Sequence, residues 1–147
     1  YFGEKELFSV INLVCYDVYG TGDKRKKIFN ILNDAIKKGK NEFIMTESEQ
    51  IIHLLYISDV IEGLRVAINL CLKEKYVNET FFLSNDSIKL KMAVLLFLKL
   101  AKSTLKINFG GMEYPPETIM RPYYGKKLPD WECKISLEEG LRNTYNL

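Results

Sequence analysis

Residues 24–27 are four consecutive cations, and they are the first feature of the sequence that could bind a ligand. They follow Asp23, which we interpret as the N-cap of a helix, so they would occupy the first helical turn. Cations are unfavourable there because a helix N-terminus already carries roughly +0.5 charge. An anionic ligand such as a diphosphate would explain them, with Lys24 and Arg25 nearest the preceding turn. A solvated helix surface explains them too, and both interpretations stay open.

Asp17 and Tyr19 form a second candidate group because they follow a predicted strand. Residues 11–16 are almost continuously apolar, which is typical of a strand buried on both faces of a parallel sheet. Open α/β sheets bind ligands beyond the carboxyl ends of their strands. We therefore expect Asp17 and Tyr19 to line a substrate pocket, although Asp17 could instead simply hydrogen-bond the turn.

The sequence offers little for metal or redox chemistry, and we expect no metal site. The three cysteines, Cys15, Cys71 and Cys133, lack the spacing of metal ligands. Each lies beside apolar residues, so we expect reduced core thiols. The single histidine, His53, has no cysteine or carboxylate at ligand spacing, and we interpret it as structural.

Aromatic residues near the C-terminus give a third group. Residues 112–129 contain all four prolines and should be mostly irregular. Within and beside this stretch, Tyr114, Tyr123 and Tyr124 could stack on a nucleotide base, but sealing the core beneath the loop is the favoured interpretation. Trp131 is interpreted as a packing anchor.

Apolar runs and apolar residues at helical spacing predict the strands and helices that position these residues. The predicted strands are residues 11–16, 42–45, 51–57, 80–84 and 106–109. Helices are predicted after the N-caps Asp23, Asp59 and Ser136, and over residues 87–102. The alternation of strands and helices predicts an α/β domain with a largely parallel sheet.

Length and composition narrow the class of protein. The 147 residues correspond to one domain, and 47% of them are hydrophobic, enough for a core. The net charge of +2 is too small to indicate a nucleic-acid partner. The longest apolar run, residues 92–98, is far short of the ~20 residues of a membrane helix, so we expect a cytoplasmic protein. The opening YFGEKELF lacks an initial Met and reads as the middle of a helix, which predicts a fragment or isolated domain.

Three phrases of the sequence together resemble one enzyme family. Residues 11–32, INLVCYDVYGTGDKRKKIFNIL, are similar to a strand ending in N-V-Y-G-P-G-D followed by a helix. Residues 48–68, SEQIIHLLYISDVIEGLRVAI, are similar to Q-x-R-D-F-I-Y-V-D-D-V with a following helix, and residues 128–145, LPDWECKISLEEGLRNTY, to G-W-x-P-x-x-x-L-E-E-G-L. In this order they resemble the C-terminal half of the NAD-dependent epimerase/dehydratase family, the extended short-chain dehydrogenases/reductases.

The resemblance implies both a fold and a function. Residues 1–147 would form the C-terminal part of a Rossmann-like parallel sheet with flanking helices and the small substrate-binding subdomain. The full-length parent would use NAD or NADP for hydride transfer on a nucleotide-diphosphate sugar, as an epimerase, dehydratase or 4-ketoreductase of polysaccharide biosynthesis. The dinucleotide fingerprint G-x-x-G-x-x-G is absent from the chain, so we expect this fragment alone to bind no cofactor and to be inactive.

The resemblance also implies candidate substrate-binding residues: Asp17, Tyr19, Lys24 and Arg25. The chain departs from the family pattern at three positions. Asp17 stands where the family often has Asn, and Thr21 replaces the usual Pro. Ile52 stands where many members have an Arg that contacts the diphosphate, so that contact is not expected here.

Tyr1 and Lys5 match the family's catalytic Y-x-x-x-K pair, but their position argues against this role. One helical turn does place residues i and i+4 side by side. A return crossover to the next strand, however, needs about 12 helical residues. Only five residues separate Lys5 from Ile11. The catalytic interpretation therefore requires residues to be missing near Val10, and otherwise the match is a coincidence.

Two hypotheses for the function follow from the sequence. The first is the substrate-binding portion of a nucleotide-sugar epimerase, dehydratase or reductase. The second is a non-catalytic α/β module that binds a nucleotide sugar or a protein partner. In either case the apolar strand at residues 11–16 would lack a neighbour on one side, so we expect a homo-oligomer.

Overall fold

The computed structural model describes residues 9–73 and 78–147, which form two compact units. The first unit consists of the described residues up to Tyr19, together with His53–Asp86 and Tyr123–Ser136. The second consists of Gly20–Ile52, Ser87–Pro122 and Leu137–Leu147. Each unit is therefore assembled from segments that are distant in the sequence.

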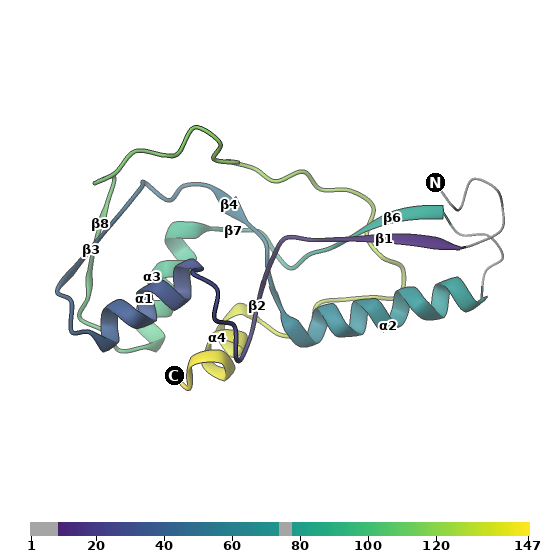
Figure 1. The fold of residues 1–147 in the computed structure, drawn as a ribbon, viewed down its shortest axis with the longest axis horizontal. Coiled ribbons are helices and arrows are strands. Elements are labelled where there is room, and N and C mark those ends of the chain that lie inside the picture. Colours follow the sequence, from purple (N-terminus) through teal and green to yellow (C-terminus); the bar gives the residue numbers. More distant parts are fainter. Residues whose placement is uncertain (1–8, 74–77) are drawn as a thin grey trace. The chain divides into compact units, whose positions relative to one another are not determined.

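The first unit is built around two parallel strands and one long helix. β1 (Val10–Cys15) pairs in parallel with β6 (Asn78–Leu83), with Val10 opposite Asn78 and Cys15 opposite Leu83. Parallel neighbours need a long crossover connection, which is usually a helix. The connection from β1 to β6 passes through residues 16–56 and ends in α2 (Ile57–Lys73), which lies along the two strands (Figure 1).

The core of this unit lies between α2 and the strands. Its buried members are Leu55, Ala67, Phe81, Leu83, Leu128 and Trp131. Gly63 permits the close approach of α2, because a Cβ atom at this position would lie 2.5 Å from Cδ1 of Leu83. The indole Nε1 of Trp131 donates a hydrogen bond to the Asp59 carbonyl at 2.9 Å. The prediction that Trp131 anchors the packing is therefore confirmed.

A second, shorter parallel pair completes the strands of the first unit. β2 (Asp17–Tyr19) follows β1 and pairs with β5 (Leu54–Tyr56), with Asp17 opposite Leu54. The last residue of β5 is followed directly by α2. The residues after β1 are thus held beside the start of the crossover helix.

Asp59 does not cap α2, and that prediction is wrong. The helix begins at Ile57, so Asp59 lies inside its first turn, where it is only 4% exposed. Its carboxylate instead accepts hydrogen bonds from the backbone N–H groups of Lys134, at 3.3 Å, and Ile135, at 3.0 Å. The thiol of Cys133 donates to the same carboxylate at 3.1 Å. Asp59 therefore fastens residues 133–135 to the start of α2.

The second unit combines two strand pairs with three helices. β3 (Glu42–Met45) is parallel to β8 (Lys106–Phe109), and β4 (Ile51–Ile52) is antiparallel to β7 (Ile88–Lys89). The helices are α1 (Ile28–Lys37), α3 (Leu90–Leu100) and α4 (Leu137–Tyr145). The ring of Phe97 joins them, since its centroid lies 5.5 Å from that of Phe29 and 5.2 Å from that of Tyr145.

The α/β class with parallel strands is confirmed, but the boundaries of three predicted elements are wrong. The strand predicted over residues 51–57 is divided at His53, because β4 pairs antiparallel with β7 whereas β5 pairs parallel with β2. The helix predicted from residue 87 begins only at Leu90, after β7. The helix predicted after Asp23 begins at Ile28. Within the described residues, no helix is long and apolar enough to cross a membrane.

Candidate functional site

The carboxyl ends of β1 and β6 define the candidate site. In parallel α/β sheets this edge is where ligands bind, because the loops that follow the strands diverge there. β1 ends at Cys15 and is followed by Tyr16, while β6 ends at Leu83 and is followed by Ser84, Asn85 and Asp86. Since Cys15 and Leu83 are opposite each other in the register, these following residues begin at the same edge.

Aromatic rings fill the space beside these strand ends. The ring of His53 lies between two tyrosines, with centroids 5.7 Å from Tyr16 and 5.4 Å from Tyr124. Its Nδ1 is 3.0 Å from the carbonyl oxygen of Asn85. His53 is only 8% exposed, so its ring contributes to the packing beside the strand ends.

Hydrogen bonds fasten the loop at Tyr123 and Tyr124 to the two strand ends. The hydroxyl of Tyr16 donates to the carbonyl of Tyr123, and the hydroxyls of Ser84 and Tyr124 are hydrogen-bonded to each other. Tyr124 therefore contributes to the packing of the first unit, as the favoured interpretation predicted. The ring of Tyr123 remains 75% exposed, although its edge contacts Phe82.

A polar cavity of about 380 Å³ opens at the end of β6. Its charged and amide-bearing lining residues are Asn85, Asp86, Lys127 and Glu132. Carboxylate and amide oxygens accept hydrogen bonds from hydroxyl groups, and the ammonium and amide N–H groups donate to their oxygens. One cation facing two carboxylates does not favour a diphosphate. The cavity is better suited to a neutral ligand rich in hydroxyl groups.

Cys133 also lines this cavity but is chemically inert there. Burial, together with the hydrogen bond and negative charge of Asp59, raises the pKa of its thiol to about 12. A nucleophilic cysteine needs the opposite, because the thiolate is the reactive form. Cys133 therefore has a structural role, in agreement with the interpretation of the cysteines as reduced core thiols.

Asp17 and Tyr19 lie in β2, just beyond β1. The backbone N–H of Asp17 donates to the carbonyl of His53 at 3.2 Å. The side chain of Tyr19 is buried, and its ring meets that of Tyr56 edge-on at 5.6 Å. The ring of Tyr19 therefore packs inside the first unit, and a role in substrate binding stays a prediction for both residues.

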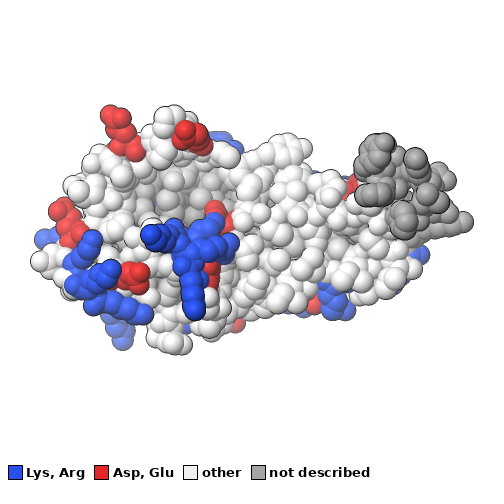
Figure 2. Space-filling view, in the orientation of Figure 1, with Lys and Arg blue, Asp and Glu red and all other residues white. Residues whose placement is uncertain are grey.

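The cations at residues 24–27 belong to the second unit and precede α1 rather than forming its first turn. α1 begins at Ile28 with Lys27 at the N-cap position, so the argument from an unfavourable helix-dipole placement is weakened. On the face shown in Figure 2, lysine and arginine side chains gather over the elements of the second unit, with acidic side chains among them.

Asp23 binds Arg25 instead of capping the helix. Its carboxylate accepts from the Arg25 guanidinium at 2.8 Å and 2.6 Å and from the Arg25 backbone N–H at 3.0 Å. The hydrogen bond from Arg25 is the main cause that lowers the pKa of Asp23 to about 2. The side-chain amide of Asn30 fixes this loop by donating to the carbonyls of Asp23 and Arg25, at 2.9 Å each. Arg25 is therefore already neutralised, whereas Lys24 forms no ion pair within the described part of the chain.

Tyr1 and Lys5 lie outside the described residues, so their role stays a prediction. Among the residues that are described, no three potential metal ligands gather at one place. The candidate residues that the sequence did not single out are those that line the cavity: Ser84, Asn85, Asp86, Lys127 and Glu132. Only their position after a predicted strand, for residues 84–86, was a usable signal.

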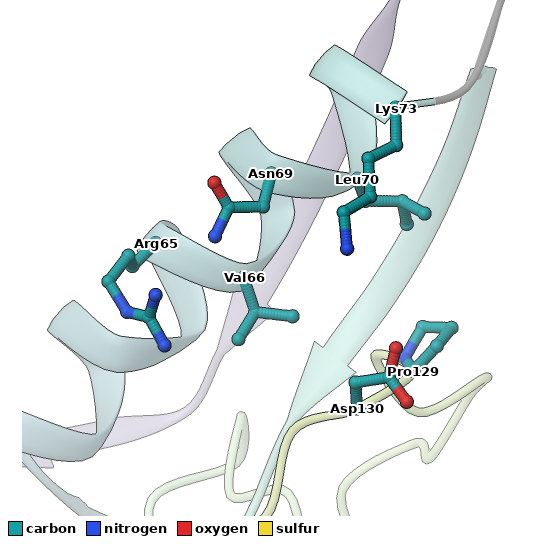
Figure 3. Close-up of a pocket in the computed structure, with 7 residues that line it drawn as sticks. All are labelled: Arg65, Val66, Asn69, Leu70, Lys73, Pro129 and Asp130. Carbon is teal, nitrogen blue, oxygen red and sulfur yellow. The ribbon is translucent and has the colours of Figure 1, made fainter.

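A second cavity in the first unit, of about 190 Å³, lies between α2 and the turn at Pro129 and Asp130. Figure 3 shows Arg65, Asn69 and Lys73 on successive turns of α2, with Asp130 across from them. Arg65 is already paired with Glu62 at 2.6 Å. The remaining charges, Lys73 and Asp130, are opposite in sign, so this cavity shows no excess charge that would select an anion or a cation.

Comparison with known proteins relates the chain to nucleotide-sugar enzymes. No protein-family model matches the chain. It is 29% identical over 114 residues to the CDP-abequose synthase of Yersinia pseudotuberculosis, a match that covers 77% of this chain and 39% of the synthase.

Solved structures share its fold. The UDP-glucuronic acid 4-epimerase of Bacillus cereus, in complex with UDP-glucuronic acid and NAD, matches with a TM-score of 0.77 at 19% identity, over 91% of this chain and 43% of the epimerase. RMD of Pseudomonas aeruginosa, complexed with NADPH, matches with a TM-score of 0.76 at 14% identity, over 99% of this chain and 50% of RMD. The chain thus spans half or less of the length of these proteins. The chain is thus similar in sequence to the CDP-abequose synthase and shares the fold of these two solved structures.

Proposed function

We propose that this chain is the substrate-binding portion of a member of the NAD-dependent epimerase/dehydratase family, an enzyme that acts by NAD(P)-linked hydride transfer on a nucleotide-diphosphate sugar. The observation that carries the proposal is the similarity to CDP-abequose synthase over 114 residues. The fold shared with the UDP-glucuronic acid 4-epimerase supports it. The polar cavity at the carboxyl end of β6 supports it as well, because its mixed donors and acceptors suit the hydroxyl groups of a sugar.

The described residues do not themselves fit the pyrophosphate of a dinucleotide. That group binds where a short glycine-rich turn leads from a strand to a helix N-terminus. Here β5 and β7 run into α2 and α3 without any intervening residue, and eight residues separate the end of β2 at Tyr19 from α1 at Ile28. None of these connections is such a turn. We therefore derive the roles of this chain's residues toward the sugar nucleotide alone.

The proposed roles follow from the chemistry of each group. Asn85, Asp86 and Lys127 would bind and orient sugar hydroxyls in the cavity. Asp17, at the edge beyond β1, would extend the same set. Lys24 belongs to the second unit and forms no ion pair within the described residues, and its contact with a diphosphate stays a prediction from the sequence.

The test is a binding titration of CDP-, UDP-, GDP- and dTDP-linked hexoses against the natural full-length protein, followed by calorimetry. Asp86→Ala and Lys127→Ala should weaken binding of the accepted nucleotide sugar. Lys73→Ala, which alters the cavity on the other side of α2, is the matched control and should leave the affinity unchanged. Absence of binding for every nucleotide sugar would refute the proposal.

The alternative is a non-catalytic α/β module that binds a nucleotide sugar or a protein partner. Hydride transfer, which changes the oxidation state of the nicotinamide, distinguishes the two functions. In the enzyme, mixing the accepted nucleotide sugar with NAD(P) or NAD(P)H should change the absorbance of the reduced nicotinamide or the stereochemistry of the recovered sugar. Tight binding with neither change would favour the alternative.

A further inference from the structure

His53 lies where three segments of the first unit meet. Its ring stands between the ring of Tyr16, which follows β1, and the ring of Tyr124 in the irregular C-terminal segment. Its Nδ1 lies 3.0 Å from the backbone carbonyl oxygen of Asn85, which follows β6. The backbone carbonyl of His53 accepts a hydrogen bond from the N–H of Asp17. One residue thus connects the three segments that supply the candidate site residues of this unit.

The hydrogen bond to Asn85 fixes the tautomer of the His53 ring. A carbonyl oxygen can only accept, so Nδ1 is the ring nitrogen that carries the proton. His53 is buried, so a carbonyl that lost this donor would be costly to leave unpaired. Packing against the tyrosines depends on the ring as a whole, whereas the hydrogen bond depends on one nitrogen. The two contributions can therefore be separated by substitution.

The loop that His53 contacts forms one wall of the polar cavity, since Ser84, Asn85 and Asp86 all line it. The hydroxyl of Ser84 is hydrogen-bonded to that of Tyr124, and the N–H of Asp86 donates to Oδ1 of Asn85 at 2.7 Å. The second of these bonds lies within the loop, so it cannot fix the loop to the rest of the unit. The bonds from Tyr124 and from His53 can, and the bond from His53 is the one that reaches Asn85.

We propose that His53 is a positioning residue, whose Nδ1–H holds the carbonyl of Asn85 so that the side chains of Asn85 and Asp86 stay at the cavity. The step from a fixed cavity wall to sugar binding rests on the proposed function, whereas the hydrogen bond itself can be tested without a ligand. Loss of the bond lets residues 84–86 populate other conformations. The apparent affinity then falls in proportion to the fraction of molecules that keep the binding conformation.

Two substitutions separate the hydrogen bond from the packing. His53→Phe keeps an aromatic ring between the two tyrosines but has no donor. His53→Asn loses the ring but keeps a nitrogen donor on Cγ, the carbon that carries Nδ1 in histidine. Each variant serves as the control for the other, and circular dichroism of both checks that they fold.

The binding test uses the natural full-length protein. His53→Phe should weaken binding of the accepted nucleotide sugar by roughly tenfold, as expected when a buried carbonyl loses its donor. Hydrogen exchange at the amide of Asp86 should become faster in the same variant, with or without a ligand. His53→Asn should return both the affinity and the exchange rate toward the wild-type values. A histidine that only packs would give the reverse order, with His53→Phe closer to the wild type than His53→Asn.

NMR of the imidazole nitrogens in the wild-type protein needs neither a ligand nor a folded variant. The resonances of His53, identified as those missing from the variants, should show a proton on Nδ1. A proton on Nε2 alone, or a loss in His53→Asn that exceeds the loss in His53→Phe, would overturn the proposal. Unchanged affinity and unchanged Asp86 exchange in His53→Phe would overturn it as well. If no nucleotide sugar binds the wild type, the proposed function is refuted instead, and the exchange rates still decide whether His53 holds the loop.

Discussion

Removal of the Asp59 carboxylate should detach residues 133–135 from α2. In the folded chain this carboxylate accepts two backbone N–H groups and one thiol, at 3.0–3.3 Å, and it is only 4% exposed. We therefore expect Asp59→Ala to destabilise the first unit, because the partly buried donors lose their charged acceptor.

The magnitude follows from the two backbone hydrogen bonds. A hydrogen bond to a charged group contributes about 1.5–3 kcal/mol, and the lower value applies because Lys134 is exposed. Two bonds at the lower value give about 3 kcal/mol. For a protein of this size, each 1 kcal/mol shifts the melting temperature by about 2–4 °C, so Asp59→Ala should lower it by roughly 6–12 °C. Asp59→Asn retains one carbonyl acceptor, so its melting temperature should lie between those of Asp59→Ala and the wild type.

The assay is thermal unfolding followed by circular dichroism, together with the fluorescence of Trp131. The indole of Trp131 donates to the backbone carbonyl of Asp59, which both variants keep, so the fluorescence of the folded state should change little. Glu62→Ala is the matched control on the same helix. It removes an exposed pair with Arg65 and should hardly alter the melting temperature. If Asp59→Ala were as stable as Glu62→Ala, the assignment of Asp59 as the anchor of residues 133–135 would be wrong.

Three further predictions concern charge. Lys24→Ala should weaken nucleotide-sugar binding by the full-length protein by roughly ten- to a hundredfold, and added salt should reduce this difference. Arg25→Ala should weaken binding less, because Asp23 already neutralises Arg25. If calorimetry gave the same affinity for Lys24→Ala and the wild type, Lys24 would be only a solvated side chain. The pKa of Asp23 is lowered from 3.8 to about 2, so its stabilising contribution is present above pH 4 and is lost as the pH falls toward 2; melting curves of Asp23→Asn should show a shallower loss in that window. The raised pKa of Cys133, about 12, should make its alkylation slow at pH 8, and Asp59→Ala should accelerate it by removing the negative charge, as mass spectrometry of iodoacetamide-treated protein would record.

The pattern of apolar residues in the sequence was sufficient to predict two elements of the first unit. The apolar run at residues 11–16 became β1, and the i, i+4 pattern after Ile57 became α2. The apolar run is typical of a strand covered on two faces and the helical spacing of a helix packed along one side. Within the described residues, however, β1 is only half-buried and its Asn12 is exposed. The fold class followed from their alternation.

Competing local hydrogen bonds explain why the start of α1 was misplaced. Asp23 has the residue type of an N-cap, but its carboxylate binds both the backbone and the side chain of Arg25, which favours a turn over a helix. The sequence contains both partners and does not reveal which interaction is the more stable. The division of the strand at His53 has a similar origin, since β4 pairs antiparallel with β7 and β5 pairs parallel with β2, and both partners are distant in the sequence.

The sequence by itself predicted the α/β class, the candidate edge after β1 and, through three ordered phrases, the resemblance to a family of nucleotide-sugar enzymes. Only the tertiary structure determined the cavity, because Asn85 and Asp86 reach it from the end of β6 whereas Lys127 and Glu132 reach it from the irregular C-terminal segment. The exposure of Leu64 and Ile68 was likewise decided by the tertiary structure. Their spacing in the sequence is that of an apolar helix face, but the core packs on the side of α2 that carries Gly63 and Ala67. The spacing of apolar residues indicates which side chains avoid water. Which surface covers them depends on contacts between segments that are distant in the chain.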